Sequence, residues 1–264
     1  MELLFQALPH ELITKIMWYT LESPHTDLEL GILKRVLGSS IYNKLMDKGG
    51  IKQDAHGHIT KVSVWDKVLD SWLLDDAERQ SLIFDIKILQ LFPNLTEFDL
   101  DDTGVFGDIS VLKALPKLTE FNLDDTDVTG NISVLKALPK LTEFNFDDTR
   151  VTGNIAVLQP LSNLTTFDLQ DTRVFGDISV LPTNLTEFRL QHTGVTGNIA
   201  VLQSLSNLTK FFINDTGVTG DIAVLKSLPN LNSFFLRRTG VFGDKQAFKK
   251  YRKSHGHEYC WVFM

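Results

Sequence analysis

Paired carboxylates recur at a fixed interval in this 264-residue chain, and each pair follows a glutamate by four residues. The triplets are Glu97 with Asp101-Asp102, Glu120 with Asp124-Asp125, and Glu143 with Asp147-Asp148. Carboxylates transfer protons, ligate hard cations such as calcium, or attract the basic groups of a partner. No phosphate loop, dinucleotide fingerprint, zinc-finger spacing or GxSxG sequence accompanies them. We therefore expect no enzyme and no cofactor, and no carboxylate whose pKa is tuned for acid–base catalysis.

The interval of the acidic triplets is the period of a larger repeat. Seven copies begin at Leu95, Leu118, Leu141, Leu164, Leu185, Leu208 and Leu231. Every step is 23 residues except the one of 21 residues from Leu164 to Leu185. A constant period of about 20–50 residues indicates a solenoid, because one unit cannot bury its apolar side without stacked neighbours.

Each position of the repeat has a predicted structural role. Apolar residues at positions 1, 4 and 6, counted from the first Leu, predict a short strand with one face in the core. Ile109, Leu112 and Leu115 are three residues apart, which favours a short 3₁₀ or helical return segment. Gly at position 13 permits a sharp turn, and the Thr at position 9 is expected to bond the backbone of the next repeat.

These columns resemble the leucine-rich repeat superfamily, LxxLxLxxNxLxGxI, from Leu95 to Asp244. T-x-V-x-G-x-I is similar to the plant-type subclass and I-x-V-L-x-x-L to the internalin-like return segment, although Thr replaces the usual Asn. The resemblance implies an α/β solenoid, with a curved parallel β-sheet on the concave face and short helical or 3₁₀ segments on the convex face. It also implies a scaffold that binds another protein through the concave face.

The chain divides into four predicted parts. Residues 1–50 form a helical cap or F-box-like segment, 51–94 a degenerate first repeat with a helical insertion, 95–243 the seven repeats, and 244–264 a helix-strand cap. In the second part we expect a strand with Ile59, Val62 and Val64 inward, and one helix from Asp75 to Leu91. In the last part we expect a basic helix from Asp244 to Lys253 and a strand from Tyr259 to Phe263.

The first 50 residues allow two interpretations. Helical runs are expected in the first twenty residues, from Leu28 to Leu37 and from Ser40 to Met46. LPHELITKIM resembles the opening of an F-box, whereas the later part lacks the family's Val-Cys and closing Trp. The segment is therefore either a plain end cap or the part of a ubiquitin-ligase substrate receptor that binds the ligase adaptor.

Positions 3 and 5 point away from the core onto the concave side, and we expect positions 7 and 8 to continue that surface. Residues 95–163 hold 12 acidic and 5 basic residues, whereas residues 231–264 hold 2 acidic and 7 basic ones. This polarity predicts a protein partner with a basic surface; solvated charge and a calcium site are the alternatives. The candidate partner-binding residues are Glu97, Asp99, Asp101, Asp102, Glu120, Asp124, Asp125, Glu143, Asp147, Asp148, Arg189, Phe212, Phe235, Arg237 and Arg238.

Composition restricts the compartment and the other ligands. A single cysteine, Cys260, allows no intrachain disulfide, and the N-terminus shows no basic leader and no long apolar run. We therefore expect a cytoplasmic protein without a membrane span. The net charge of −7 argues against general nucleic-acid binding. Two His-Gly-His pairs, at 56–58 and 255–257, would lie at opposite ends of the solenoid and cannot form one metal site.

Overall fold

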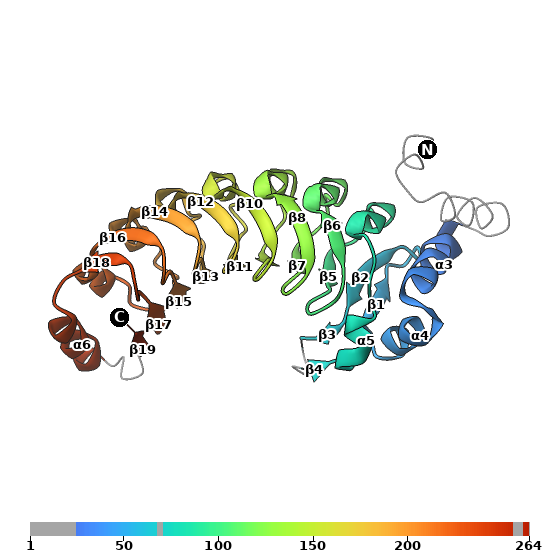
Figure 1. The fold of residues 1–264 in the computed structure, drawn as a ribbon, viewed down its shortest axis with the longest axis horizontal. Helices are drawn as coiled ribbons and strands as arrows, with labels where there is room; N and C mark the ends of the chain where they lie inside the picture. Colours follow the sequence, from blue (N-terminus) through green and yellow to red (C-terminus); the bar gives the residue numbers. More distant parts are fainter. Residues whose placement is uncertain (1–24, 68–70, 256–260, 264) are drawn as a thin grey trace.

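The computed structural model describes residues 25–67, 71–255 and 261–263, and these form a curved solenoid (Figure 1). Its inner side is a ten-stranded sheet in the order β1-β2-β5-β7-β9-β11-β13-β15-β17-β19. All neighbours are parallel except β1 and β2, which are antiparallel. The strands are β1 (Ile51–Gln53), β2 (Ile59–Ser63), β5 (Glu97–Asp99), β7 (Glu120–Asn122), β9 (Glu143–Asn145), β11 (Thr166–Asp168), β13 (Glu187–Arg189), β15 (Lys210–Phe212), β17 (Ser233–Phe235) and β19 (Trp261–Phe263).

A second parallel sheet, which the sequence analysis did not predict, runs along the side of the arc between the inner strands and the outer turns (Figure 1). We call it the flank sheet. Its strands are β6 (Phe106–Asp108), β8 (Asp127–Asn131), β10 (Arg150–Asn154), β12 (Arg173–Asp177), β14 (Gly194–Asn198), β16 (Gly217–Asp221) and β18 (Gly240–Phe242). The Gly at position 13 has a positive φ in every copy, for example 121° at Gly130, as the turn requires.

The convex wall consists of 3₁₀ turns, which confirms the expected return segments. Each turn begins after an Asp or Asn whose side chain accepts a hydrogen bond from the backbone, as Asp108 does from Ser110 N at 2.7 Å. The turn of the 21-residue repeat is the shortest. The turns are η1 (Ile86–Leu91), η2 (Ile109–Ala114), η3 (Ile132–Ala137), η4 (Ile155–Leu158), η5 (Ile178–Val180), η6 (Ile199–Ser204) and η7 (Ile222–Ser227).

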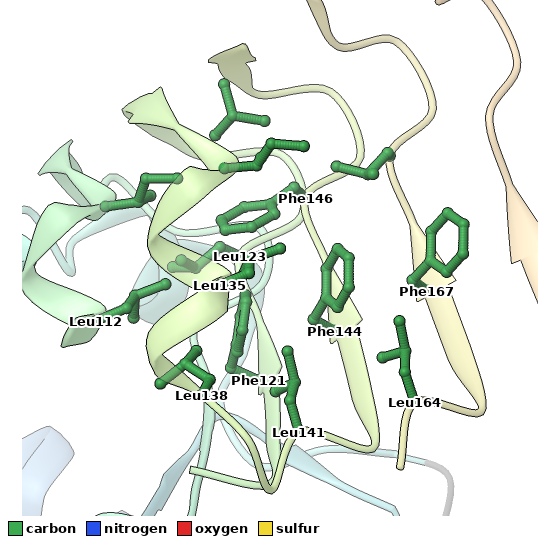
Figure 2. Packing of buried hydrophobic residues seen from close by; sticks show 14 of the residues in the cluster. Leu112, Phe121, Leu123, Leu135, Leu138, Leu141, Phe144, Phe146, Leu164 and Phe167 are labelled. Carbon is green, nitrogen blue, oxygen red and sulfur yellow. The ribbon is translucent and has the colours of Figure 1, made fainter. Parts of the chain in front are cut away.

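The core between these walls is a set of side-chain columns (Figure 2). Position 4 is Phe in all seven repeats, and each ring stacks on the next, as Phe144 does on Phe167 at 5.6 Å between ring centroids. Phe146 takes the place that Leu123 and Leu169 have in the neighbouring repeats, and it lies edge-on to Phe121 at 5.0 Å. Stacking of like residues in register therefore holds adjacent repeats together.

Two threonine columns satisfy the polar backbone between and within repeats. Thr119 Oγ1 donates to the carbonyl of Thr96 in the preceding repeat at 2.9 Å, and the same bond recurs along position 2. The position 9 hydroxyls bond within their own repeat instead, as Thr149 Oγ1 does to Phe146 O at 2.6 Å. Our expectation that position 9 would link to the next repeat was wrong, because the bend after the strand turns this side chain back onto it.

The N-terminal end is covered by α3 (His25–Leu37) and α4 (Ser39–Asp47), which confirms two of the expected helical runs. Leu33, Leu37 and Leu45 on these helices join the solenoid core. The first helical run, and with it LPHELITKIM, lies outside the described residues. The strand expected around Ile59 and Val62 is confirmed as β2, which pairs with β5.

The insertion of the first repeat differs from its prediction as a single helix from Asp75 to Leu91. It forms α5 (Asp76–Gln80), which carries a capping box from Asp75, and then η1 after a break at residues 81–85. Asp85 starts the second segment by accepting a hydrogen bond from Lys87 N at 2.8 Å, so η1 takes the same place in the convex wall as the repeat turns. A hairpin of β3 (Trp65–Asp66) and β4 (Ser71–Trp72) precedes it on the inner side of the arc (Figure 1).

The C-terminal cap is confirmed as α6 (Lys245–Ser254) followed by β19. Phe248 of α6 is buried against the last ring of the phenylalanine column, Phe234. Arg252, which is also buried, donates to the carbonyls of Leu228 and Leu231. A basic side chain thus covers the polar end of the last repeat.

Candidate functional site

The concave face places the predicted acidic residues of positions 3 and 5 in straight rows. Glu97 pairs in register with Glu120, and Glu120 with Glu143; Asp99 is followed by Asn122 and Asn145. The position 7 residues Asp101, Asp124 and Asp147 follow the same strands and form a third row, half-buried in each case. Neighbouring strands are about 4.8 Å apart, so these carboxylates are close enough to repel one another.

The glutamates of position 3 are already paired with lysines of the chain. Lys61 on β2 forms an ion pair with Glu97. Lys67, from the β3–β4 hairpin, places its Nζ 2.9 Å from both Glu120 and Glu143. Burial opposes the charged form of Lys67, but the hydrogen bonds that Lys67 donates to the two glutamates dominate and raise its pKa. The row at position 3 therefore keeps a single net negative charge, because two lysines pair with three glutamates.

The position 7 aspartates differ, because none of the three has an ion-pair partner within the residues that the structure describes. Burial, followed by repulsion from Asp124, raises the pKa of Asp101 to about 7. Burial and repulsion from Asp168 likewise raise the pKa of Asp124 to about 6 and that of Asp147 to about 7. These three residues, which we call the aspartate row, retain part of their protons near neutral pH, and the negative charge that they carry above about pH 7 is not compensated by a cation of the described chain.

We predicted no carboxylate whose pKa is tuned for acid–base catalysis, and that stays a prediction, because these shifts arise from burial and from repulsion between neighbouring aspartates. Asp99, which is more deeply buried, also has its pKa raised to about 6 by desolvation. The sequence shows which residues carry a charge, but it does not show how far each is removed from water. That desolvation arises only in the folded chain, where neighbouring strands bring the side chains together on the curved face. A cation that reached these groups would lower their pKa and release protons.

The aspartate row is extended, which bears on the calcium alternative. Among the described residues, no group of three or more His, Cys, Asp or Glu side chains converges closely enough to hold a metal ion. A row with one carboxylate per strand instead matches cationic groups that are themselves spaced along an extended ligand.

The position 8 residues lie differently at the two ends of the arc. At the C-terminal end they share a hollow with the concave-face residues Phe235 and Arg237, and these position 8 residues are His192, Asp215 and Arg238. All seven have a left-handed backbone, with φ between 46° and 57°, which turns the chain toward the flank. Asp102 is bound by Arg79 and Gln80 of α5, at 2.8 and 2.7 Å. Asp125 and Asp148 line a hollow on the flank with Arg150. These three aspartates therefore face a different side of the molecule from Asp101 and Asp124.

The other end of the concave face is aromatic and basic, as predicted. The rings of Phe212 and Phe235 lie 4.9 Å apart, and the Arg189 guanidinium is 5.3 Å from the Phe212 ring. Arg189 also joins Asp168 and Glu187 at 3.1 and 2.9 Å, which balances the charge in the middle of the sheet.

The last repeat presents two further cations beyond these rings. Arg237 is exposed, and Arg238 is 3.2 Å from Asp215. The face thus changes along the arc from uncompensated carboxylates to neutral pairs and then to aromatic and cationic groups.

Two residues of the concave face, Lys61 and Lys67, escaped the sequence analysis. They pair with the glutamates, and Trp65, at position 7 of the first strand, stands beside them, 4.8 Å from Trp72 between ring centroids. Lys61 lies at position 3 of the degenerate first repeat, in register with Glu97, so the repeat pattern could have identified it, whereas Lys67 belongs to the unrepeated hairpin.

In the described part of the chain, no helix has the length and apolar character needed to cross a bilayer.

Comparisons with known proteins show which solved structures have a similar fold. No family model matches the sequence, and no curated protein matches it either. Among solved structures, internalin C2 of Listeria monocytogenes is similar over 74% of this chain and 86% of its own, with 24% identity and a TM-score of 0.55. The plant peptide hormone receptor RGFR1, in complex with RGF2, is similar over 73% of this chain and 33% of its own, with 18% identity and a TM-score of 0.54.

A third solved structure agrees with these two. The leucine-rich repeat ectodomain of the Arabidopsis thaliana receptor kinase GASSHO1/SCHENGEN3 is similar over 59% of this chain, with 18% identity and a TM-score of 0.50. This chain covers only 22% of that ectodomain. The likeness at these identities concerns the fold, and it agrees with the parallel concave sheet, the 3₁₀ wall and the capped ends. The chain therefore has the leucine-rich repeat solenoid fold.

Proposed function

We propose that this protein is a non-catalytic module that binds a protein partner through its concave face, with the aspartate row as the principal contact. The observation that carries the proposal is the contrast between the glutamates at repeat position 3 and the aspartates at repeat position 7. Glu97, Glu120 and Glu143 are each paired with a lysine of the chain, whereas Asp101, Asp124 and Asp147 are left without a cation. A basic partner supplies the missing charge.

The polarity of the face defines the partner further. Basic side chains of the ligand lie over β5, β7 and β9, and its apolar or acidic groups lie over Phe212, Phe235 and Arg237. Aromatic and arginine side chains are common anchors in interfaces. The similar plant peptide hormone receptor RGFR1 is in complex with RGF2, which supports ligand binding by a protein of this fold.

A synthetic peptide that alternates lysine and alanine over ten residues tests the contact by calorimetry. We expect it to bind the wild type and to lose at least about tenfold in affinity for the Asp101→Lys, Asp124→Lys double variant, because like charges replace attractive ones. Glu97→Gln is the matched control, since Glu97 is already paired with Lys61. The proposal is wrong if the peptide binds the double variant as tightly as the wild type.

The ubiquitin-ligase interpretation of residues 1–50 remains a prediction. Burial of Leu33, Leu37 and Leu45 in the solenoid core supports the role of an end cap for α3 and α4. A chain that lacks residues 1–50 is expected to aggregate if these helices are a cap. It is expected to stay soluble and bind the lysine peptide if they serve only an adaptor.

A further inference from the structure

Most of the exposed large apolar side chains lie on the flank sheet or next to its edge. Among the described residues, five large apolar side chains are exposed; three of them lie in one column of the flank sheet, and a fourth, Ile83, adjoins Gly104 just before β6. Ile83, Phe106, Phe175 and Phe242 are 68%, 44%, 50% and 62% exposed, and the three phenylalanines occupy position 12 of their repeats. Threonine fills position 12 in the repeats between them, so the column is uncharged along its whole length.

The phenylalanines are placed symmetrically on the flank sheet. The sheet has seven strands, and Phe106 is on β6 at one edge, Phe242 on β18 at the other edge, and Phe175 on β12 in the middle. From Phe106 to Phe242 the column reads Phe-Thr-Thr-Phe-Thr-Thr-Phe, which is the same in both directions. A surface that reads alike from both ends is self-complementary about a two-fold axis at its centre.

Position 10, the neighbouring column, has large side chains in the middle of one half of the sheet and none in the other half. Gly104 precedes β6, and the column then holds Asp127, Arg150 and Arg173 on β8 to β12, and Gly194, Gly217 and Gly240 on β14 to β18. None of these three glycines has a positive φ, although a Cβ at Gly217 or Gly240 would come within 2.9 and 2.8 Å of a neighbouring threonine methyl group. The fold accommodates a side chain there in another repeat, because Arg150 stands beside Thr129 in the same register in which Gly217 stands beside Thr196.

We propose that two copies of this chain associate through their flank sheets about a two-fold axis that runs along β12. Phe175 then meets the partner's Phe175, and Phe106 meets the partner's Phe242. Asp127 and Arg150 face the partner's Gly217 and Gly194, so large side chains lie over small ones. The arc curves in the plane of Figure 1 and the flank strands run from its inner to its outer side, so this axis superposes the two arcs along their length.

The available area agrees with a reversible dimer. Seven strands spaced by about 4.8 Å, with up to five residues of about 3.3 Å each, offer about 500 Å² per copy and about 1,000 Å² in total. Specific interfaces begin at about this size. Arg173 lies near the axis and meets its own copy, so salt is expected to strengthen the dimer by screening this repulsion.

The mass in solution tests the proposal, measured by light scattering and sedimentation from about 10 μM to 1 mM. We expect the wild type to approach twice its 29.8 kDa at the upper end. Phe175→Asp should stay at 29.8 kDa with an unchanged melting temperature, because Phe175 is exposed in the single copy. Ile83→Asp is the matched control: Ile83 is the most exposed of the four but lies outside the seven strands, so it should leave the dimer intact.

Disulfide trapping tests the axis, in a Cys260→Ser background. Thr129 on β8 and Thr219 on β16 are the same number of strands from β12, on opposite sides. The Thr129→Cys and Thr219→Cys variants should form disulfide-linked dimers when they are mixed, and neither should do so alone. A monomer at 1 mM, dissociation by Ile83→Asp, or self-linking of Thr129→Cys would each overturn the proposal.

Discussion

The Nζ atom of Lys67 lies 2.9 Å from the carboxylate of Glu120, although the two residues are 53 positions apart. The contact holds the β3–β4 hairpin against the concave sheet, and a second bond of the same length to Glu143 extends it over one more repeat. The chain thus shows, with its own lysine, how this face accommodates an ammonium group.

Replacing Lys67 with Met should lower stability only slightly. Lys67 is 59% exposed, and exposed ion pairs are worth about 1 kcal/mol or less. We expect the free energy of unfolding in urea to fall by at most that amount at low salt, and the difference to disappear near 1 M salt, where the Debye length is about 3 Å. Lys113→Met, on the convex turn η2, is the control. A loss above about 2 kcal/mol, or one that persists at high salt, would contradict this.

The aspartate row should make the protein less stable as the pH rises. The pKa values of Asp101, Asp124 and Asp147 are raised from 3.8 to about 7, 6 and 7, so the folded chain binds more protons than the unfolded chain in this interval. Stability contributed by these groups is therefore fully present near pH 4 and is lost as the pH rises through about 6–7.

Asp124→Asn isolates this effect. It should raise the free energy of unfolding at pH 8 by about 1 kcal/mol, a figure reduced for the partial exposure of the side chain, and should give no gain at pH 4. Asp108→Asn is the matched control, because Asn131 caps the next turn in the same way as Asp108. Thermal melts from pH 4 to 8 measure both, and an identical pH dependence in the wild type and Asp124→Asn would refute the assignment.

The phenylalanine column should tolerate loss of a ring poorly. Phe144 is 1% exposed and stacks between Phe121 and Phe167 at 5.7 and 5.6 Å, so Phe144→Ala leaves a cavity between two repeats. We expect a cost of about 3–5 kcal/mol in denaturant unfolding. Phe146→Leu restores the residue found at position 6 of the adjacent repeats and should cost no more than about 1.5 kcal/mol. Equal losses for the two variants would contradict the stacking argument.

The position 9 hydroxyl should be worth a buried hydrogen bond. Thr149→Val keeps the shape of the side chain but removes the donor to Phe146 O, and leaves that carbonyl with one partner fewer. The expected cost is about 1–2 kcal/mol of unfolding free energy. Thr152→Val, three residues later on the exposed side of β10, should change stability by at most about 0.5 kcal/mol. No difference between the two variants in urea titrations would show that the buried bond contributes nothing.

The repeated part of the fold was predictable because each column has one environment. Phe at position 4 is buried in all seven copies and Ile at position 15 in the six copies that have it. Seven copies therefore agree on the concave strand, and six agree on the convex turn. The flank sheet was missed because Val at position 11 is the only large buried side chain in its five-residue strands, and the Gly at position 13 indicates a turn. Pairing with identical neighbours, rather than local propensity, makes this segment a strand.

The candidate site was predictable in its residues but not in its energetics. The sequence identified the acidic rows, yet Lys67 reaches Glu143 across 76 positions, and no repeat column contains it. The distinction between paired glutamates and unpaired aspartates depends on that single contact and on Lys61. Similarly, one helix was predicted from Asp75 to Leu91 because its apolar residues suit a helix, whereas Asp85 begins a separate turn.

The 21-residue repeat shows that the length of the convex turn can vary while the concave strands keep their spacing. Its convex turn η5 has three residues where η2 has six, yet Phe167 and Phe188 keep a ring separation of 5.7 Å and β11 and β13 stay in register. The spacing of the concave strands therefore does not change when the convex turn is shortened. Inserting or deleting a whole repeat would lengthen or shorten the concave face by one strand spacing, so the same repeat unit can form binding faces for ligands of different length.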